Sequence, residues 1–391
     1  MNNPLQDPGF LRNPYPVFAA LRSTSPVQEL PGGGGRSSYL VTGHAEARAA
    51  FTDPRLSKDT AAFFAGKDTG RNLHPAVSRS MLATDPPRHT RLRSLVTKAF
   101  TPGAVARLRP YIARVTDELL DAWVPGEPTD AIAGLAVPLP VTVICQLLGV
   151  PATDRAAVRT WSNELFAAGR PERIDAASHA VAGYLAELVE AKRRTPGDSL
   201  LDDLIRARDG GDRLSEDELV SLAVLLLVAG HETTTNLIGN GLLALLRTPD
   251  SLHRLRDEPD LVDAAVEELL RFDSPVSTAT FRFATEDMTL GGTGIPAGSP
   301  VLIAPGAANR DPARFPAPDR LDLDRDTRGH LAFGHGIHHC LGAPLARAEA
   351  AIAFRRVATR FPRLRLASPG AEPQWRHTRL LRGLEALPVL P

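Results

Sequence analysis

One long apolar helix limits the fold of this chain more than any other feature of its sequence. Ser215 and Glu218 have the spacing of a capping box, and the apolar run that follows continues to about Arg247. At 1.5 Å per residue, a helix of roughly thirty residues spans about 45 Å, the full width of a domain of this size. We therefore expect a large helical domain with this helix at its centre.

Helical patterns also dominate the rest of the 391 residues. Apolar residues recur at three- and four-residue spacing over 104–123 and 174–194, which predicts two more amphipathic helices. Strand-like sequence is sparse, and residues 288–304 predict a short hairpin with glycine and proline turns. The Pro/Gly-rich segments are too short to be linkers and no repeat is visible, so we expect one mainly α domain over residues 1–391.

Charge and cysteine content argue against several classes of protein. Lys plus Arg and Asp plus Glu both number 45, so no net charge favours binding to nucleic acid or to an acidic membrane surface. Two cysteines 195 positions apart do not make a disulfide framework, which favours a reducing compartment. The N-terminal residues lack the pattern of a signal peptide. We expect a cytoplasmic protein.

A second uncharged segment, residues 131–150, has the composition of a membrane span but not its continuity. Pro138 and Pro140 lie inside it, and each would leave a backbone group unpaired in lipid. The segment therefore predicts buried core, with Cys145 as a small packed apolar residue.

The middle of the long helix, AGHETTTN over residues 229–236, has an unusual composition. Glycine and three successive threonines are weak helix formers, and Glu232 lies among them. One interpretation is a solvated patch in which threonine hydroxyls bond back to carbonyl groups. The other is a local distortion that opens a groove, where Glu232 and Thr233 supply protons.

The remaining cysteine lies in the sequence FGHGIHHCLGAP, residues 333–344. A zinc site needs four converging ligands, whereas His338, His339 and Cys340 are consecutive and no second cysteine pair exists. A nucleophilic cysteine would need a partnered base and an oxyanion site, and the sequence marks neither. Both alternatives are therefore weak.

Glycines in the same segment suit a third possibility, a flat and bulky ligand. Gly334, Gly336 and Gly342 carry no side chain, so the backbone can approach such a ligand closely. Cys340 comes just before a helix predicted over 341–361, whose positive end favours a thiolate by about 0.3–1 kcal/mol. Thiolate is a standard axial ligand of haem iron.

This segment resembles a known family signature. FGHGIHHCLG is similar to the haem-binding pattern F-G-x-G-x-[HR]-x-C-x-G of the cytochrome P-450 superfamily. Further similarities follow the family's order along essentially the whole chain, most like soluble actinomycete-type members: DPPRHTRLR (85–93), AGHETT (229–234), EELLR and FPAPDRLD.

The resemblance implies the family's fold and cofactor. That fold is a single large helical domain with small peripheral β-sheets, and its haem b is buried between the long central helix and the cysteine-loop helix. Cys340 would be the iron ligand. The groups that would hold the haem propionates are His89, Arg93, Arg282 and His338, of which His89 and Arg93 share one helix face at i and i+4.

A buried ion-pair network is also implied by the resemblance. Glu268 and Arg271 form the Glu-x-x-Arg pair, and Arg320 of FPAPDRLD would join it. We interpret this network as structural, since a buried charge that loses its partner is strongly destabilising.

The activity implied by the resemblance is monooxygenation, either hydroxylation or epoxidation. Glu232 would carry protons and Thr233 would donate a hydrogen bond beside the bound oxygen. Electrons would come from a separate ferredoxin and an NAD(P)H-dependent ferredoxin reductase. Arginines 347, 355 and 356 would form a docking surface or merely a solvated helix face.

The implied substrate pocket is apolar, which favours a secondary metabolite such as a polyketide, macrolide or terpenoid. Segments 60–80 and 160–180 would form its roof, and its lining would include Leu225, Val228, Ala229, Thr278 and Leu380. Two alternatives stay open at this point, a peroxide-driven haem enzyme and a haem-thiolate sensor or electron carrier that oxygenates nothing.

Overall fold

The structure is a computed structural model, and it describes residues 5, 8–31, 37–67, 70–167, 169–209, 214–378 and 380–391. Its chain forms two compact units. Unit 1 comprises residues 1–57, 116–136 and 233–391, and unit 2 comprises residues 58–115 and 137–232. The prediction of a single domain stays a prediction.

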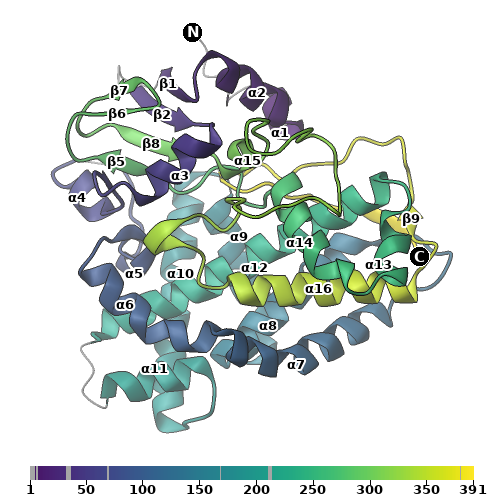
Figure 1. Ribbon diagram of the computed structural model, residues 1–391. Coiled ribbons are helices and arrows are strands. Elements are labelled where there is room, and N and C mark those ends of the chain that lie inside the picture. Colours follow the sequence, from purple (N-terminus) through teal and green to yellow (C-terminus); the bar gives the residue numbers. More distant parts are fainter. Residues whose placement is uncertain are drawn as a thin grey trace. The chain divides into compact units, whose positions relative to one another are not determined.

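The secondary-structure elements named among the described residues of unit 2 are all helices, joined by loops (Figure 1). It contains the whole or the larger part of α4 (Thr60–Phe64), α5 (Pro75–Ser78), η3 (Met81–Ala83), α6 (Arg88–Thr97), η4 (Lys98–Phe100), α7 (Pro102–Leu120), α8 (Pro138–Leu148), η6 (Ala152–Asp154), α9 (Arg155–Phe166), α10 (Pro171–Arg194), α11 (Leu200–Asp209) and α12 (Glu216–Arg247). The helices predicted over 104–123 and 174–194 are α7 and α10, each within three residues at both ends.

Unit 1 combines helices with all of the described strands. Its helices are α1 (Pro8–Arg12), α2 (Tyr15–Thr24), α3 (His44–Thr52), η5 (Ile132–Ala136), α13 (Ser251–Asp257), α14 (Leu261–Phe272), α15 (Pro305–Ala308), η7 (Gly336–His338) and α16 (Ala343–Arg360). Its strands are β1 (Val27–Pro31), β2 (Ser37–Val41), β3 (Leu56–Ser57), β4 (Thr129–Asp130), β5 (Arg282–Ala284), β6 (Met288–Leu290), β7 (Thr293–Ile295), β8 (Pro300–Ile303), β9 (Arg365–Leu366) and β10 (Pro388–Leu390). The predicted mainly α fold with small β-sheets is confirmed.

The strands form three small sheets. The largest has the order β1-β2-β8-β5-β3, with β2 parallel to β8 and the other pairs antiparallel; the others are β4-β10-β9 and β6-β7. The predicted hairpin is confirmed over β6 and β7, where Met288 lies opposite Ile295. It is shorter than expected, because β8 leaves it and pairs with β2 and β5.

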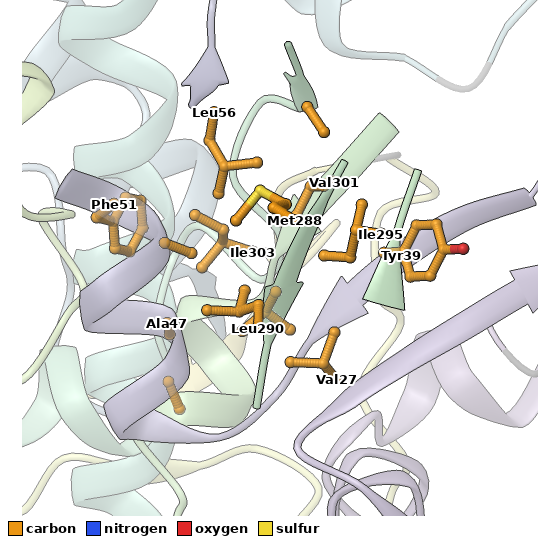
Figure 2. Packing of buried hydrophobic residues seen from close by; sticks show 14 of the residues in the cluster. Val27, Tyr39, Ala47, Phe51, Leu56, Met288, Leu290, Ile295, Val301 and Ile303 are labelled. Atoms are coloured by element: carbon orange, nitrogen blue, oxygen red, sulfur yellow. The ribbon is translucent and has the colours of Figure 1, made fainter. Parts of the chain in front are cut away.

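Alternation along β2 explains how the five-stranded sheet is covered. Tyr39 and Val41 belong to a cluster that includes Phe51 of α3. Figure 2 shows Phe51 on the side of Ile303, and Tyr39 beside Ile295. Leu40 belongs to another cluster, with Phe18 of α2. Successive side chains of a strand point to opposite faces, so the two helices bury opposite faces of one sheet.

The long helix α12 (Glu216–Arg247) starts as its capping box predicts. The Glu218 N–H donates to Ser215 Oγ at 3.2 Å, and the Ser215 N–H donates to Glu218 Oε2 at 3.2 Å. By length and composition α12 is the one described helix that could cross a membrane, but 72% of its most apolar window is buried in the protein. A helix buried to this extent has the character of a core helix.

The uncharged segment 131–150 is also mostly buried. It forms the π-helical turn η5 and then α8, which ends at Gly149 with a φ of 70°. Cys145 on α8 is fully buried, as predicted.

Candidate functional site

The cysteine loop, residues 333–342, depends on two glycines with left-handed backbone. Gly334 and Gly336 have φ values of 71° and 75°, which other residues rarely adopt. A Cβ on Gly336 would also lie 2.9 Å from Thr52 Cγ2 and 3.1 Å from the Phe51 carbonyl oxygen. The Cys340 N–H donates to the Phe333 carbonyl oxygen at 2.9 Å and closes the loop.

The loop presents an accessible thiol at the start of a helix. Cys340 is exposed, and α16 begins three residues later with Pro344 in its first turn. Cys145 is the opposite case, because burial raises the pKa of its thiol to about 11. Of the chain's two cysteines, only Cys340 can offer sulfur to a ligand.

Two predicted cations of unit 1 lie around this loop. Arg282 opens β5, is almost fully buried, and places its guanidinium carbon 5.0 Å from the centre of the Phe51 ring. The same ring lies 3.8 Å from where a Cβ on Gly334 would be. Phe51 therefore contacts both the arginine and the cysteine loop. His338 ends η7 within the loop and is partly buried.

The other two predicted cations lie on α6 in unit 2. His89 and Arg93 are one helical turn apart, and His89 is buried whereas Arg93 is partly exposed. Burial and then the positive charge of Arg93 lower the pKa of His89. The imidazole is therefore neutral at pH 7, where it has one N–H to donate beside the charged arginine.

The middle of α12 contradicts one of the two sequence interpretations. The helix is uninterrupted from Glu216 to Arg247, so the expected distortion does not break it. The solvated patch is wrong, because Glu232, Thr234 and Thr235 are buried. The local distortion that opens a groove stays a prediction. Gly230 has a packing role instead, since a Cβ there would lie 2.8 Å from Ile144 Cδ1 of α8.

One face of α12 nevertheless remains accessible. Its residues are Leu225, Val228, Ala229 and Thr233, partly or fully exposed among buried neighbours. The spacing of three and four residues puts them on one side of the helix, where the sequence predicts substrate contacts and the hydroxyl donor.

Sequence reasoning gave no role to His231, which lies next to Glu232. Its Nδ1 is 3.0 Å from the Leu227 carbonyl oxygen, and because a carbonyl only accepts, Nδ1 carries a proton. Its Nε2 is 3.8 Å from Glu232 Oε1, and both side chains are 2% exposed. The two side chains therefore lie side by side inside the protein. The sequence signal that could have identified His231 is its position directly before Glu232.

Two further predicted pocket residues are neighbours in unit 1. The Thr278 N–H donates to the Leu380 carbonyl oxygen at 3.2 Å, and Leu380 is partly exposed. The turn after Leu380 is anchored on α12, where Asn240 Nδ2 donates to the Arg382 carbonyl oxygen at 3.0 Å. That these residues and the accessible face of α12 line one pocket stays a prediction.

The predicted ion-pair network is present with one correction. Arg271 Nε and Nη2 donate to Glu268 Oε2 and Oε1 at 2.7 and 2.8 Å, and both side chains are fully buried. The side chain that joins them belongs to Arg325, 3.2 Å from Glu268 Oε1 and 9% exposed. The guanidinium of Arg320 pairs with Asp322 instead and is 73% exposed.

Arg320 was wrongly assigned because the chain turns between the two arginines. Its carbonyl oxygen, not its guanidinium, faces the network and accepts from Arg271 Nη2 at 3.4 Å. The sequence DRLDLDR offered both arginines at a spacing of five residues. Only the backbone path decides which guanidinium reaches Glu268.

The predicted docking arginines of α16 differ in their partners. Arg347 forms a two-point ion pair with Glu267, and Arg356 lies 3.2 Å from Asp117. Arg355 is exposed. Much of the positive charge on this helix is therefore neutralised within the protein.

These groups fit a haem. The thiol is accessible, and the loop before it is built on glycines. The predicted propionate partners are side chains that can donate hydrogen bonds to carboxylates: Arg282, His338, His89 and Arg93. Within the described ranges, no group of three or more His, Cys, Asp or Glu side chains is placed to hold a metal ion.

Comparisons with known proteins identify similar sequences and structures. The family model described as Cytochrome P450 matches residues 163–372. Cytochrome P450 107B1 of Saccharopolyspora erythraea is 46% identical over 98% of this chain and 96% of its own length. Cytochrome P450 monooxygenase PikC of Streptomyces venezuelae is 47% identical over 97% of this chain and 91% of its own length.

A solved structure extends this similarity to the fold. The tirandamycin C-bound P450 monooxygenase TamI superposes with a TM-score of 0.92 and 48% identity, covering 98% of this chain and 99% of TamI. The expected fold class is confirmed.

Proposed function

This chain belongs to the cytochrome P450 family, and we propose that it inserts one oxygen atom of O2 into an apolar secondary metabolite. It is a haem-thiolate monooxygenase, as its named relatives are monooxygenases and hydroxylases. The substrate class rests on those relatives, which include 6-deoxyerythronolide B hydroxylase and mycinamicin IV hydroxylase/epoxidase. A polyketide, macrolide or terpenoid is the proposed substrate, and hydroxylation or epoxidation the proposed reaction.

The observation that carries this proposal is the cysteine loop. It presents an exposed thiol three residues before α16, whereas the other cysteine is buried with a raised pKa. Cys340 would supply the thiolate that holds haem b. When bound, haem supplies the iron that binds and activates dioxygen.

Four side chains would hold the two carboxylates of this cofactor. Arg282 and Arg93 offer guanidinium forks, which bind carboxylate oxygens in pairs. His89 and His338 each offer a ring N–H. Arg282 and His89 are buried, so their hydrogen bonds would be little weakened by water.

Proton movement is assigned to two adjacent residues of α12. Glu232 would hold a proton in a buried position with His231 beside it, and Thr233 would donate a hydrogen bond from the accessible face. The apolar residues of that face, Leu225, Val228 and Ala229, would contact the substrate together with Thr278 and Leu380. Such a lining would select substrates that are apolar and fit its shape.

Electrons would come from a separate ferredoxin and an NAD(P)H-dependent ferredoxin reductase in the cytoplasm. Cytochrome P450 107B1 is matched over 96% of its length by 98% of this chain. Arg355, exposed on α16, supports a docking surface on that helix.

The test compares two cysteine variants of the haem-loaded protein. Reduced wild-type protein with carbon monoxide should show the long-wavelength Soret band of thiolate ligation. Cys340→Ser should lose this band, and Cys145→Ala should keep it. A band retained by Cys340→Ser would overturn the ligand assignment.

A second experiment addresses the reaction. A library of polyketides, macrolides and terpenoids would be screened by difference spectroscopy. Compounds that bind would then be incubated with NAD(P)H, a ferredoxin, its reductase and isotopically labelled dioxygen. One labelled oxygen atom in the product is expected, and a product without label would contradict monooxygenation.

A further inference from the structure

One carboxylate of α14 joins both flanks of the cysteine loop. Glu267 Oε1 accepts from Arg347 Nε at 2.6 Å, and Oε2 accepts from Arg347 Nη2 at 2.9 Å. His330 Nε2 is 2.9 Å from the same Oε2. His330 precedes the loop and Arg347 follows it on α16, which lies beside α14 in unit 1 (Figure 1).

The hydrogen bonds of this cluster have a defined direction. His330 Nδ1 accepts the Ala332 N–H at 3.2 Å, so Nε2 carries the ring proton and donates it to Glu267. Burial by itself would raise the pKa of Glu267, but the hydrogen bonds from His330 and Arg347 lower it to about 2. Glu267 is therefore a charged acceptor at neutral pH.

The cluster reaches the cysteine through an aromatic ring. The Arg347 guanidinium carbon lies 4.5 Å from the centre of the Phe333 ring, a cation–π distance. The Phe333 carbonyl oxygen accepts the Cys340 N–H at 2.9 Å. A continuous path of contacts thus runs from Glu267 through Arg347 and Phe333 to the backbone of Cys340.

We propose that Glu267 is a positioning residue for the sulfur of Cys340, because it holds Arg347 over Phe333 and ties both flanks of the loop to α14. This inference rests on the proposed role of Cys340 as haem ligand. Groups that orient a ligand in this way stabilise metal binding without touching the metal. Without the carboxylate, Arg347 loses the partner that fixes its guanidinium plane, and the loop backbone gains freedom.

The experiment measures how long thiolate ligation survives in the haem-loaded protein. The ferrous carbon monoxide complex of Glu267→Gln should convert from the long- to the short-wavelength Soret band roughly tenfold faster than wild type. Asp263→Asn is the matched control, since Asp263 is exposed one turn earlier on α14. It should convert at the wild-type rate.

Two further variants test whether the effect passes through Arg347. Arg347→Lys keeps the charge but loses the planar fork, so its rate should lie between those of wild type and Glu267→Gln. The double variant Glu267→Gln/Arg347→Gln should convert no faster than Arg347→Gln alone. Additive rates, or a Glu267→Gln rate equal to the control, would overturn the proposal.

Circular dichroism recorded on the same samples distinguishes global unfolding from loss of thiolate ligation in the folded protein. Conversion of the band with native dichroism supports positioning, whereas equal loss of both contradicts it. If Glu267→Gln does not fold, Arg347→Lys decides by the same criterion. A long-wavelength band in Cys340→Ser would instead refute the ligand assignment itself, whatever the rate in Glu267→Gln.

Discussion

Gly230 of α12 lies so close to Ile144 of α8 that a Cβ on the glycine would be 2.8 Å from both Ile144 Cδ1 and Cγ1. Neither carbon can move away freely, because Ile144 is almost fully buried. The glycine sets how closely these two helices approach.

Gly230→Ala should therefore destabilise the protein by about 1–3 kcal/mol through overpacking, although alanine is the better helix former by about 1 kcal/mol. Urea unfolding measures the change. Gly183→Ala is the control, since Gly183 is an α10 glycine with open space around it. That variant should be more stable than wild type, and a Gly230→Ala variant that is stabilised as well would refute the packing role.

The ion-pair network predicts different effects for two nearby arginines. Arg325→Ala should lower the free energy of unfolding by about 3 kcal/mol, because it removes one partner from the fully buried Glu268. Arg320→Ala should change it little, since that guanidinium is exposed. Chemical denaturation of both variants measures the two changes in the free energy of unfolding. A larger loss for Arg320→Ala would support the prediction from sequence that Arg320 joins the Glu268–Arg271 pair.

Thr233→Ala should separate oxygen chemistry from structure. Threonine is a weaker helix former than alanine, so folding and haem binding should be kept. Product formed per NAD(P)H should fall by roughly tenfold or more while hydrogen peroxide rises, because proton delivery loses its donor. Both products and NAD(P)H consumption would be measured with a verified substrate.

Thr234→Ala and Thr235→Ala are the controls for this effect. Both threonines are buried, whereas Thr233 lies on the accessible face of α12. Both variants should form as much product per NAD(P)H as wild type does. If Thr233→Ala forms as much product per NAD(P)H as wild type, Thr233 is not the hydrogen-bond donor for proton delivery.

Haem retention should depend on His89 and Arg93. Each alanine variant should weaken retention by about 1.5–3 kcal/mol, the worth of a hydrogen bond to a charged group. The rate of haem transfer to an excess of an apo-globin measures it. Thr90→Ala, on an exposed position of α6 beside His89, should retain haem as wild type does. Wild-type retention in the double variant would exclude the propionate role.

Glu349 of α16 predicts a pH-dependent stability. Burial raises its pKa well above 4.5, and within the described chain its buried Oε2 has no hydrogen-bond partner. Above pH 4.5 the unfolded chain loses this proton while the folded chain keeps it, so the native state loses stability as pH rises.

Glu349→Gln removes that loss because glutamine resembles the protonated acid. The variant should gain stability relative to wild type by about 1.4 kcal/mol per pH unit above the unfolded pKa, until the native carboxyl ionises. Urea unfolding at several pH values measures the difference. Glu187→Gln, exposed on α10, should show no such trend. A difference that is constant with pH would contradict the buried acid.

Features that depend only on residues close together in the sequence could be predicted from the sequence alone. The capping box of Ser215 and Glu218 starts α12 because its two hydrogen bonds span only three residues. Cys145 is buried within an uncharged segment, as its composition predicted. Periodicity and local backbone chemistry act within a few residues, so they are visible in the chain itself.

Only the tertiary structure decided which distant groups meet. Arg325 reaches Glu268 while Arg320 turns outward, although both stand in one short segment. Gly230 appeared to weaken a helix, and its function became visible only with Ile144 opposite it. Glu267 drew no notice beside Glu268, yet it contacts both His330 and Arg347. Such contacts depend on the path of the backbone between residues far apart in sequence, and residue spacing does not encode that path.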